Sequence, residues 1–276
     1  MMWVFNSFIG TVFDAIVWPV RGLGPWPVMI EVSFLTGLLM LVIFRRTSNQ
    51  DGIRAAKNRI KAHLLELRLY KDSLAQQLRS QGRILAANGR YIGYALKPML
   101  VMIVPVVLIL VQLNLWFGSR PLRVGESALV KLKLAKGGDP LKTDLRLEAP
   151  AGIEVETPAL RIEDEGEIDW RVRARSEGGH DLVFRSGGET FTKSLSVGQK
   201  RMTKISALKP GPGLTGQVFN PGEKPVPGSF SIASVEVAFP ARKMDLFGLG
   251  VHWLVVYFIL SIIFGFAFKG VFKVEI

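Results

Sequence analysis

Residues 99–117 spell MLVMIVPVVLILVQLNLWF, a run of 19 residues without a charged side chain. A helix of that length rises about 28 Å, close to the roughly 30 Å of a bilayer's hydrocarbon core. A buried helix of a soluble protein is the alternative interpretation, but soluble helices of this length normally carry a polar stripe. The stretch therefore predicts a transmembrane helix, and the rest of the chain is interpreted around it.

Two further apolar runs predict two more membrane spans. PVMIEVSFLTGLLMLVIF at 27–44 contains one charge, Glu31, and VHWLVVYFILSIIFGFAF at 251–268 contains one histidine. The chain as a whole is 49% hydrophobic and 21% charged, so apolar and polar residues are segregated along it. We expect an α-helical integral membrane protein with three transmembrane helices, at 27–44, 99–117 and 249–268.

The first 20 residues differ from these spans. Their apolar side chains recur at helical spacing, while Asn6, Gly10 and Asp14 lie on the opposite face. A basic amino-terminal region and a small-residue cleavage site are both missing, so a signal peptide is not expected. Residues 1–20 instead predict an amphipathic helix lying in the membrane interface.

The segment between the first two spans is strongly basic. Residues 45–97 carry twelve Lys or Arg and three acidic residues, which accounts for most of the chain's net charge of +12. Apolar residues at steps of three and four over 50–96 predict a cytoplasmic hairpin of two helices that turns near residue 72. One uninterrupted helix is the alternative. The basic bias places this segment and the carboxyl terminus in the cytoplasm, with the amino terminus and residues 118–250 outside.

The charge of this hairpin has two interpretations. In the simpler one, the positive charges keep the segment on the cytoplasmic side of the membrane and in contact with water. The sharper one is contact with an acidic partner, namely anionic lipid headgroups, ribosomal RNA or a nascent chain. The residues expected to make that contact are basic side chains spread over both helices: Arg54, Lys57, Lys61, Arg68, Lys71, Arg79 and Arg83.

Residues 120–240 change to a period of two, typical of β-strands. In EIDWRVRAR, for example, Ile168, Trp170 and Val172 alternate with charged residues. Six further short strands separated by glycine-rich turns predict an extracytoplasmic antiparallel β-sandwich. Trp170 in a middle strand is compatible with an immunoglobulin-like core. Residues 208–228, rich in proline, predict a semi-rigid loop.

The sequence offers little for enzyme chemistry. It has no cysteine, which excludes disulfides, thiolate zinc sites and cysteine nucleophiles. Its histidines are scattered: His63 in the hairpin, His180 in an expected turn and His252 at the start of the third span. Residues 211–216 match G-x-G-x-x-G but include a proline and lack a following helix pattern. We therefore expect no enzyme activity, cofactor or metal site.

Polar residues inside the predicted spans remain to be explained. Side chains of this kind are costly in lipid, so they should face the bundle or a wet cavity. The simpler interpretation is that the Ser and Thr hydroxyls bond to backbone carbonyls of their own helices, and that Asn114 and Lys97 extend to the membrane surface. The functional one is a hydrophilic groove between the spans, opened by the bend that Pro105 imposes on its helix. The groove candidates are Glu31, Ser33, Thr36, Lys97, Gln112, Asn114 and Ser261.

This order of elements resembles the YidC-type membrane protein insertase superfamily. The stretch that carries the resemblance is IRAAKNRIKAHLLELRLYKDSLAQQLRSQGRILAANGRYIGYALKPMLVMIVPVVLIL, beginning at Ile53. Its charged hairpin is followed by Leu96-Lys97-Pro98-Met99-Leu100 and Pro105, similar to the family's L-P-M-L-x-x-x-P entry into the membrane. Three spans are typical of the archaeal and ER-membrane-complex relatives. The groove arginine of bacterial members is absent, and the β domain has no counterpart in the family.

The resemblance implies a physical mechanism. A hydrated groove in the inner leaflet would lower the cost of bringing the polar flank of a client membrane protein partway across, and the hairpin would receive that client. The implied location is a bacterial cytoplasmic (inner) membrane. The competing hypothesis is a structural or assembly subunit of an envelope complex, which binds a membrane or extracytoplasmic partner through its β-sandwich.

Overall fold

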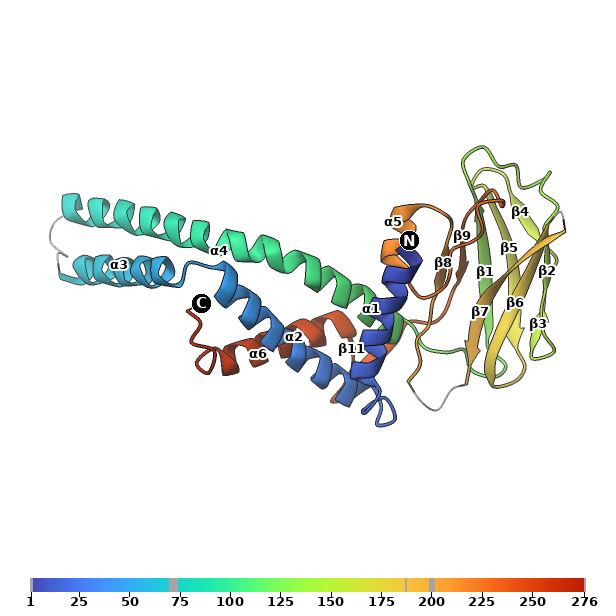
Figure 1. The fold of residues 1–276 in the computed structure, drawn as a ribbon, viewed down its shortest axis with the longest axis horizontal. Helices are drawn as coiled ribbons and strands as arrows, with labels where there is room; N and C mark the ends of the chain where they lie inside the picture. Colours follow the sequence, from blue (N-terminus) through green and yellow to red (C-terminus); the bar gives the residue numbers. More distant parts are fainter. Residues whose placement is uncertain (1, 70–73, 187, 199–201, 276) are drawn as a thin grey trace. The chain divides into compact units, whose positions relative to one another are not determined.

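The computed structural model describes residues 2–69, 74–186, 188–198 and 202–275, and it divides into two compact units (Figure 1). The β-rich unit comprises Met1–Met29 and Ile109–Val256. The helical unit comprises Ile30–Leu108 and Tyr257–Ile276. The predicted combination of apolar helices with antiparallel β-sheets is confirmed.

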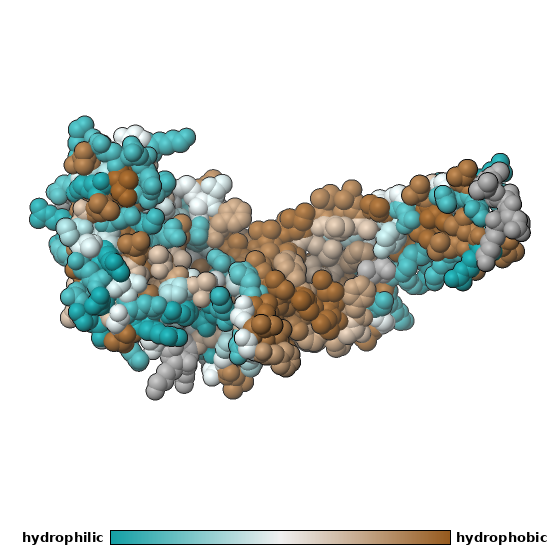
Figure 2. Space-filling model, turned by 180° about the vertical axis from the view of Figure 1, so that it is seen from behind, coloured by the Kyte–Doolittle hydropathy of each residue, from teal (hydrophilic) through white to brown (hydrophobic). Residues whose placement is uncertain are grey.

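Two helices are long and apolar enough to cross a membrane. They are α2 (Pro25–Thr47) and α4 (Leu74–Phe117), and they contain the predicted spans at 27–44 and 99–117. A third apolar helix, α6 (Trp253–Phe268), has 16 residues. In Figure 2 hydrophobic residues dominate the apolar parts of these helices, whereas hydrophilic residues also appear where Gln50–Leu69 lies beside the first half of α4.

The third apolar helix is shorter than the span predicted at 249–268. Residues 249–252, expected to begin the helix, form strand β11 (Leu249–His252), which pairs with β10 (Lys243–Leu246). His252 therefore ends a strand and does not open a helix. A short apolar run is compatible with either structure, and here its pairing with the preceding segment decides for the strand.

The basic segment forms an antiparallel helix pair. Helix α3 (Gln50–Leu69) lies beside the first half of α4 (Figure 1), and Ser80 Oγ donates a hydrogen bond across the pair to Glu66 Oε2 at 2.9 Å. The predicted turn near residue 72 lies outside the described residues. Helix α4 then continues through Pro98 and Pro105, so the second hairpin helix and the second span are one element.

The amino-terminal helix α1 (Met2–Val17) packs against the rest of the β-rich unit through a mixed face, which buries Asn6 together with Phe13 and Val17. Asn6 Nδ2 donates a hydrogen bond to the Gln217 carbonyl at 2.8 Å, and Lys204 Nζ donates to Asp14 Oδ2 at 2.7 Å. Phe5 and Phe8 are exposed on the other face, as an interfacial helix requires.

The β-rich unit contains two larger antiparallel sheets. The six-stranded sheet runs in the order β3-β5-β1-β9-β8 with β4 also paired to β5, and the three-stranded sheet runs β2-β6-β7. The strands are β1 (Ser127–Leu134), β2 (Arg146–Glu148), β3 (Ile153–Val155), β4 (Leu160–Ile162), β5 (Glu167–Ala174), β6 (Gly178–Ser186), β7 (Glu189–Val197), β8 (Leu208–Pro210) and β9 (Ile232–Val237).

Both sheets contribute to one hydrophobic core. Trp170 of β5 meets Phe184 of β6 edge to face, with ring centroids 5.7 Å apart. Phe184 in turn stacks on Phe191 of β7 at 4.9 Å. Along β1, the alternation that predicted the strand is realised as alternating burial, with Val130 and Leu132 inside.

Two local predictions in this unit are wrong. The proline-rich segment 208–228 contains strand β8 and the short helix α5 (Leu214–Phe219). His180 lies within β6 and pairs with Leu195 of β7, whereas a turn was expected there. Strand β8 forms by pairing with β9, and His180 is held in β6 by pairing with β7. Pairing with a strand distant in sequence leaves no local pattern.

Candidate functional site

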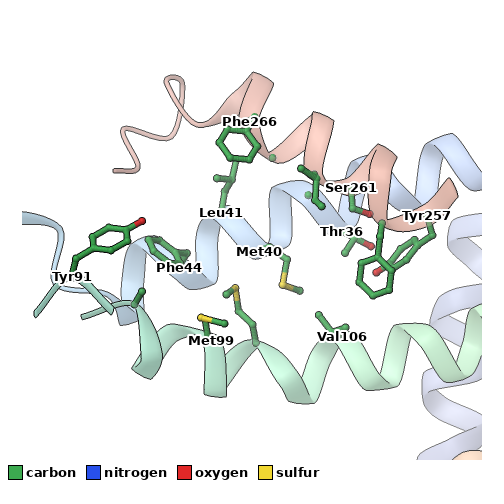
Figure 3. A pocket seen from close by; sticks show the side chains of 16 residues that line it. Thr36, Met40, Leu41, Phe44, Tyr91, Met99, Val106, Tyr257, Ser261 and Phe266 are labelled. Carbon is green, nitrogen blue, oxygen red and sulfur yellow. The ribbon is translucent and has the colours of Figure 1, made fainter. Parts of the chain in front are cut away.

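A cavity of about 390 Å³ lies within the helical unit, between α2, the middle of α4 and α6. Its wall is predominantly apolar (Figure 3). The lining residues are Thr36, Gly37, Met40, Leu41, Phe44, Tyr91, Ala95, Met99, Met102, Val106, Tyr257, Phe258, Ser261, Ile262, Gly265 and Phe266. We call this space the three-helix cavity.

The three-helix cavity has a polar end and an apolar remainder. The hydroxyl groups of Thr36, Tyr257 and Ser261 gather at one end, as Figure 3 shows. Thr36 Oγ1 donates to the Val32 carbonyl at 2.7 Å. The hydroxyl groups of Tyr257 and Ser261 are buried, and the Tyr257 hydroxyl interacts with the side chains of both Thr36 and Ser261. The three hydroxyls therefore form one polar cluster, which offers hydrogen-bonding groups to an occupant of the cavity.

Methionines occupy the middle of the cavity. The side chains of Met40 on α2 and Met99 on α4 point into it in Figure 3, and Met102 also lines it. Methionine is unbranched and adapts its shape, which suits surfaces that accept apolar partners of variable sequence. Sequence analysis did not select these methionines because apolar residues in an apolar span carry no distinguishing signal.

Small residues and aromatic rings hold α2 against α6 beside the cavity. A Cβ at Gly37 would lie 3.0 Å from the Ser261 carbonyl oxygen and 3.1 Å from the Gly265 nitrogen, so the two backbones approach closely there. Phe34 meets Phe264 and Phe268 edge to face, at centroid distances of 5.4 and 5.5 Å. This side of the cavity is consequently fixed by packing.

The groove candidates do not all share this site. Thr36 and Ser261 line the cavity, but Glu31, Ser33 and Lys97 do not. Ser33 Oγ and Glu31 Oε2 are buried without a hydrogen-bond partner among the described residues, and Lys97 is exposed. The cavity itself contains far less polarity than the hydrophilic groove that was expected.

Gln112 and Asn114 belong to the β-rich unit instead. Gln112 lines a second, polar pocket of about 200 Å³ beneath α1, together with Asn6, Asp14 and Lys204. Asn114 is exposed. The sequence placed both residues on the same helix as the groove, but the periodicity of one helix cannot tell which neighbour each of its ends will meet.

The basic contact candidates lie on α3 and the first half of α4. Arg54 and Lys57 each lie 3.4 Å from a carboxylate oxygen of Glu275, and Arg83 lies 3.9 Å from Glu66. Hydrogen bonds from His63 and Ser80 hold the pKa of Glu66 below its ordinary value. Lys61 and Arg68 border a shallow apolar depression formed with Leu64, Leu65 and Leu67, and Arg79 is exposed. Lys71 lies outside the described residues.

The β-rich unit buries a cluster of charge that the sequence did not reveal. Lys193 of β7 is completely buried and forms an ion pair with Glu223, while Lys209 Nζ lies 3.8 Å from the same carboxylate. Burial lowers the pKa of both lysines, and the Glu223 carboxylate opposes that shift. Because the charges are paired internally, this cluster stabilises one arrangement of the fold.

The chain matches no protein-family model and no curated protein. Among solved structures it is similar to "Crystal structure of the S-layer protein rSbsC(31-844)" (15% identity, 29% of this chain and 12% of that one, TM-score 0.23). It is also similar to "Crystal structure of the S-layer protein SbsC domains 4 and 5" (15% identity, 30% and 48%, TM-score 0.24). The chain spans less than half the length of each.

Metal chemistry has no evident place in the described part of the chain. The residues that the structure describes contain no group of three or more His, Asp or Glu side chains able to hold an ion. The three-helix cavity offers hydroxyls and thioethers but no carboxylate or imidazole. Its chemistry is that of a binding surface for apolar groups with a few hydrogen-bonding partners at one end.

Proposed function

We propose that this chain is a membrane protein insertase or chaperone of YidC type, in which the three-helix cavity receives the apolar segment of a client. The observation that carries the proposal is a cavity of about 390 Å³ walled by methionine and aromatic side chains between three apolar helices. The span–hairpin–span order of the sequence supports the same function. This proposal moves the client site from a hydrophilic groove to an apolar cavity.

In this proposal α2, α4 and α6 all cross the bacterial cytoplasmic membrane. The α3–α4 hairpin and the carboxyl terminus lie in the cytoplasm, and the amino terminus lies outside with the two β-sheets, which form an immunoglobulin-like sandwich. Helix α1 lies in the outer interface with Phe5 and Phe8 toward lipid. Arg45 and Arg46 at the end of α2 support the orientation.

The mechanism follows from the two ends of the cavity. An apolar client segment gains contacts with Met40, Met99 and Met102, which can adjust to different side chains. A polar group of the client exchanges hydrogen bonds with the hydroxyl cluster of Thr36, Tyr257 and Ser261 at one end of the cavity. A charged group at the bilayer centre costs about 2.5–3.5 kcal/mol on insertion scales, so even partial compensation accelerates entry.

Site-specific photocrosslinking in membranes tests this function with matched neighbours. Crosslinkers at Met40 and Met102 face the cavity, whereas Leu39 and Ile103 are the adjacent exposed residues that do not line it. We expect nascent membrane proteins to be captured from Met40 and Met102, and lipid from Leu39 and Ile103. Equal client capture at all four positions, or none at any, would contradict the proposal.

An envelope assembly subunit is the second candidate function. Two exposed leucines, Leu129 of β1 and Leu160 of β4, pair with Arg171 and Asp169 of β5 and so lie on the same face of the six-stranded sheet. Exposed apolar side chains that share one face are typical of a protein interface. Purification in mild detergent should then yield a stoichiometric partner that is lost on Leu129→Glu with Leu160→Glu.

A further inference from the structure

The β10–β11 hairpin ends in an exposed apolar tip. Its turn is Leu246-Phe247-Gly248-Leu249, in which the Phe247 side chain is 99% exposed and Leu249 is 70% exposed. Phe247 also has φ +52°, a left-handed backbone conformation that is unfavourable for a bulky residue. In water, a phenylalanine at this position is disfavoured both by its exposure and by its left-handed backbone conformation.

The turn is held in shape by polar groups at its base. Asp245 Oδ1 accepts a hydrogen bond from the Gly248 backbone N–H at 2.9 Å. Gly248 takes the second left-handed position, with φ +84°, so the tip is a tight two-residue turn. Met244 is fully buried on the inner face of the hairpin. The tip is therefore presented by a defined structure.

The base of the hairpin is fastened to the ends of three apolar helices. Trp26 Nε1, in the first turn of α2, donates to the Asp245 carbonyl at 3.0 Å. The Arg242 backbone N–H donates to the Gly118 carbonyl, directly after α4, at 3.4 Å. Trp253 begins α6 directly after β11 and stacks on Phe117, the last residue of α4, at 6.5 Å.

The length of α6 points in the same direction. Its 16 residues rise about 24 Å, some 6 Å less than a typical hydrocarbon core. A span that short draws the adjoining residues toward the bilayer or thins the bilayer locally. The residues that adjoin it are those of the hairpin. Lys243, the exposed first residue of β10, is placed to meet lipid phosphates.

We propose that the β10–β11 tip is an interfacial anchor, which inserts Phe247 and Leu249 into the outer boundary between lipid headgroups and acyl chains. The partner is the lipid surface itself. The open hairpin edges stay at headgroup level, because unpaired backbone groups are not tolerated in the hydrocarbon core. The anchor would fix the outer ends of α2, α4 and α6 at one depth. It depends on α6 crossing the bilayer as proposed above, but not on insertase activity.

Spin-label depth measurement tests the anchor in the full chain. The sequence has no cysteine, so single substitutions label one site each in vesicles of phosphatidylethanolamine and phosphatidylglycerol. Nitroxides at Phe247→Cys and Leu249→Cys report the tip, and the second keeps the test valid if the first disturbs the strained turn. Leu141→Cys, exposed in the loop after β1, is the aqueous control, and Ile263→Cys, exposed on α6 and outside the cavity lining, reports α6.

We expect the ratio of oxygen to water-soluble nickel chelate accessibility at both tip labels to be several-fold higher than at Leu141→Cys. Tip ratios equal to that of Leu141→Cys, with Ile263→Cys in lipid, would overturn the anchor alone. An aqueous Ile263→Cys would overturn the span and the anchor together. Tip labels shielded from both reagents would also overturn it, because the tip would then contact a second copy of the protein.

Discussion

The β-rich unit buries its apolar side chains in a core, whereas the long apolar helices leave most of theirs exposed. In the β-rich unit, alternating residues of both sheets converge on one core that includes Trp170 and Phe184. In the two long apolar helices, by contrast, only 39% of the most apolar stretch of α2 and 28% of that of α4 is buried. Leu100, Ile103 and Val104 of α4 lie exposed.

The difference is the one expected if the apolar parts of α2 and α4 lie in lipid, as proposed, while the β core forms in water. Water drives apolar side chains together, and the β-rich core has the corresponding composition. Lipid solvates the exposed apolar side chains of a helix, so they need no protein partner. Stability should therefore depend on buried contacts in the first unit and much less on the exposed apolar side chains of the second.

Replacing Glu223 by Gln should have the largest effect on stability. Lys193 and Lys209 would then be buried without a negative partner, which typically costs about 3–5 kcal/mol. Chemical denaturation of the full chain in detergent, monitored by tryptophan fluorescence, measures the loss in the free energy of unfolding. The matched change in the helical unit is Glu275→Gln, whose partners Arg54 and Lys57 remain in contact with water, and we expect no resolvable loss there.

The same leucine-to-alanine change in each unit sharpens the comparison. Leu132 is 0% exposed in the β core, so Leu132→Ala should cost about 2–5 kcal/mol through lost contacts and a cavity. Leu100 on α4 is 59% exposed, so Leu100→Ala should change the free energy of unfolding by less than about 0.5 kcal/mol. Comparable losses in the free energy of unfolding for the two variants would contradict the proposal that Leu132 is buried in protein and Leu100 faces lipid.

Acid should weaken the β-rich unit through Glu126. A paired hydrogen bond with Arg120, at 2.8 Å to each carboxylate oxygen, lowers the pKa of Glu126 from 4.5 to about 2. The stabilisation is complete above pH 4.5 and is lost as pH falls toward 2, a change of up to about 3 kcal/mol. The melting temperature of Glu126→Gln should consequently lie below that of the native chain at pH 6 and approach it near pH 2.

Much of the fold could be predicted from the sequence because burial and exposure leave a pattern among neighbouring residues of a helix or strand. Uninterrupted apolar runs gave the helices at 27–44 and 99–117, and alternation gave most strands, including those around Leu132 and Trp170. The hairpin was expected to end at residue 96 and the second span to begin at 99. Helix α4 instead continues through Pro98, although a proline inside a helix typically costs about 3 kcal/mol.

The candidate site was less predictable because it depends on contacts between elements. Thr36 and Ser261 were selected for their polarity and do line the three-helix cavity. Gln112 was selected for the same reason and lies beneath α1. Met40, Met102 and Tyr257 look like ordinary members of an apolar run, and only the packing of α2, α4 and α6 distinguishes them. The strand β11 was missed for the same reason.

The central claim is that the three-helix cavity receives clients, and filling it is the most direct test. Purified protein in sealed vesicles is supplied with a small membrane protein, and the protease-protected fraction of that client is measured. Met40→Trp fills the cavity, while Leu39→Trp adds the same ring outside it. We predict protection above that of protein-free vesicles for the native chain and Leu39→Trp, and protection near the protein-free level for Met40→Trp. Full protection by Met40→Trp, or none by the native chain, would contradict the claim.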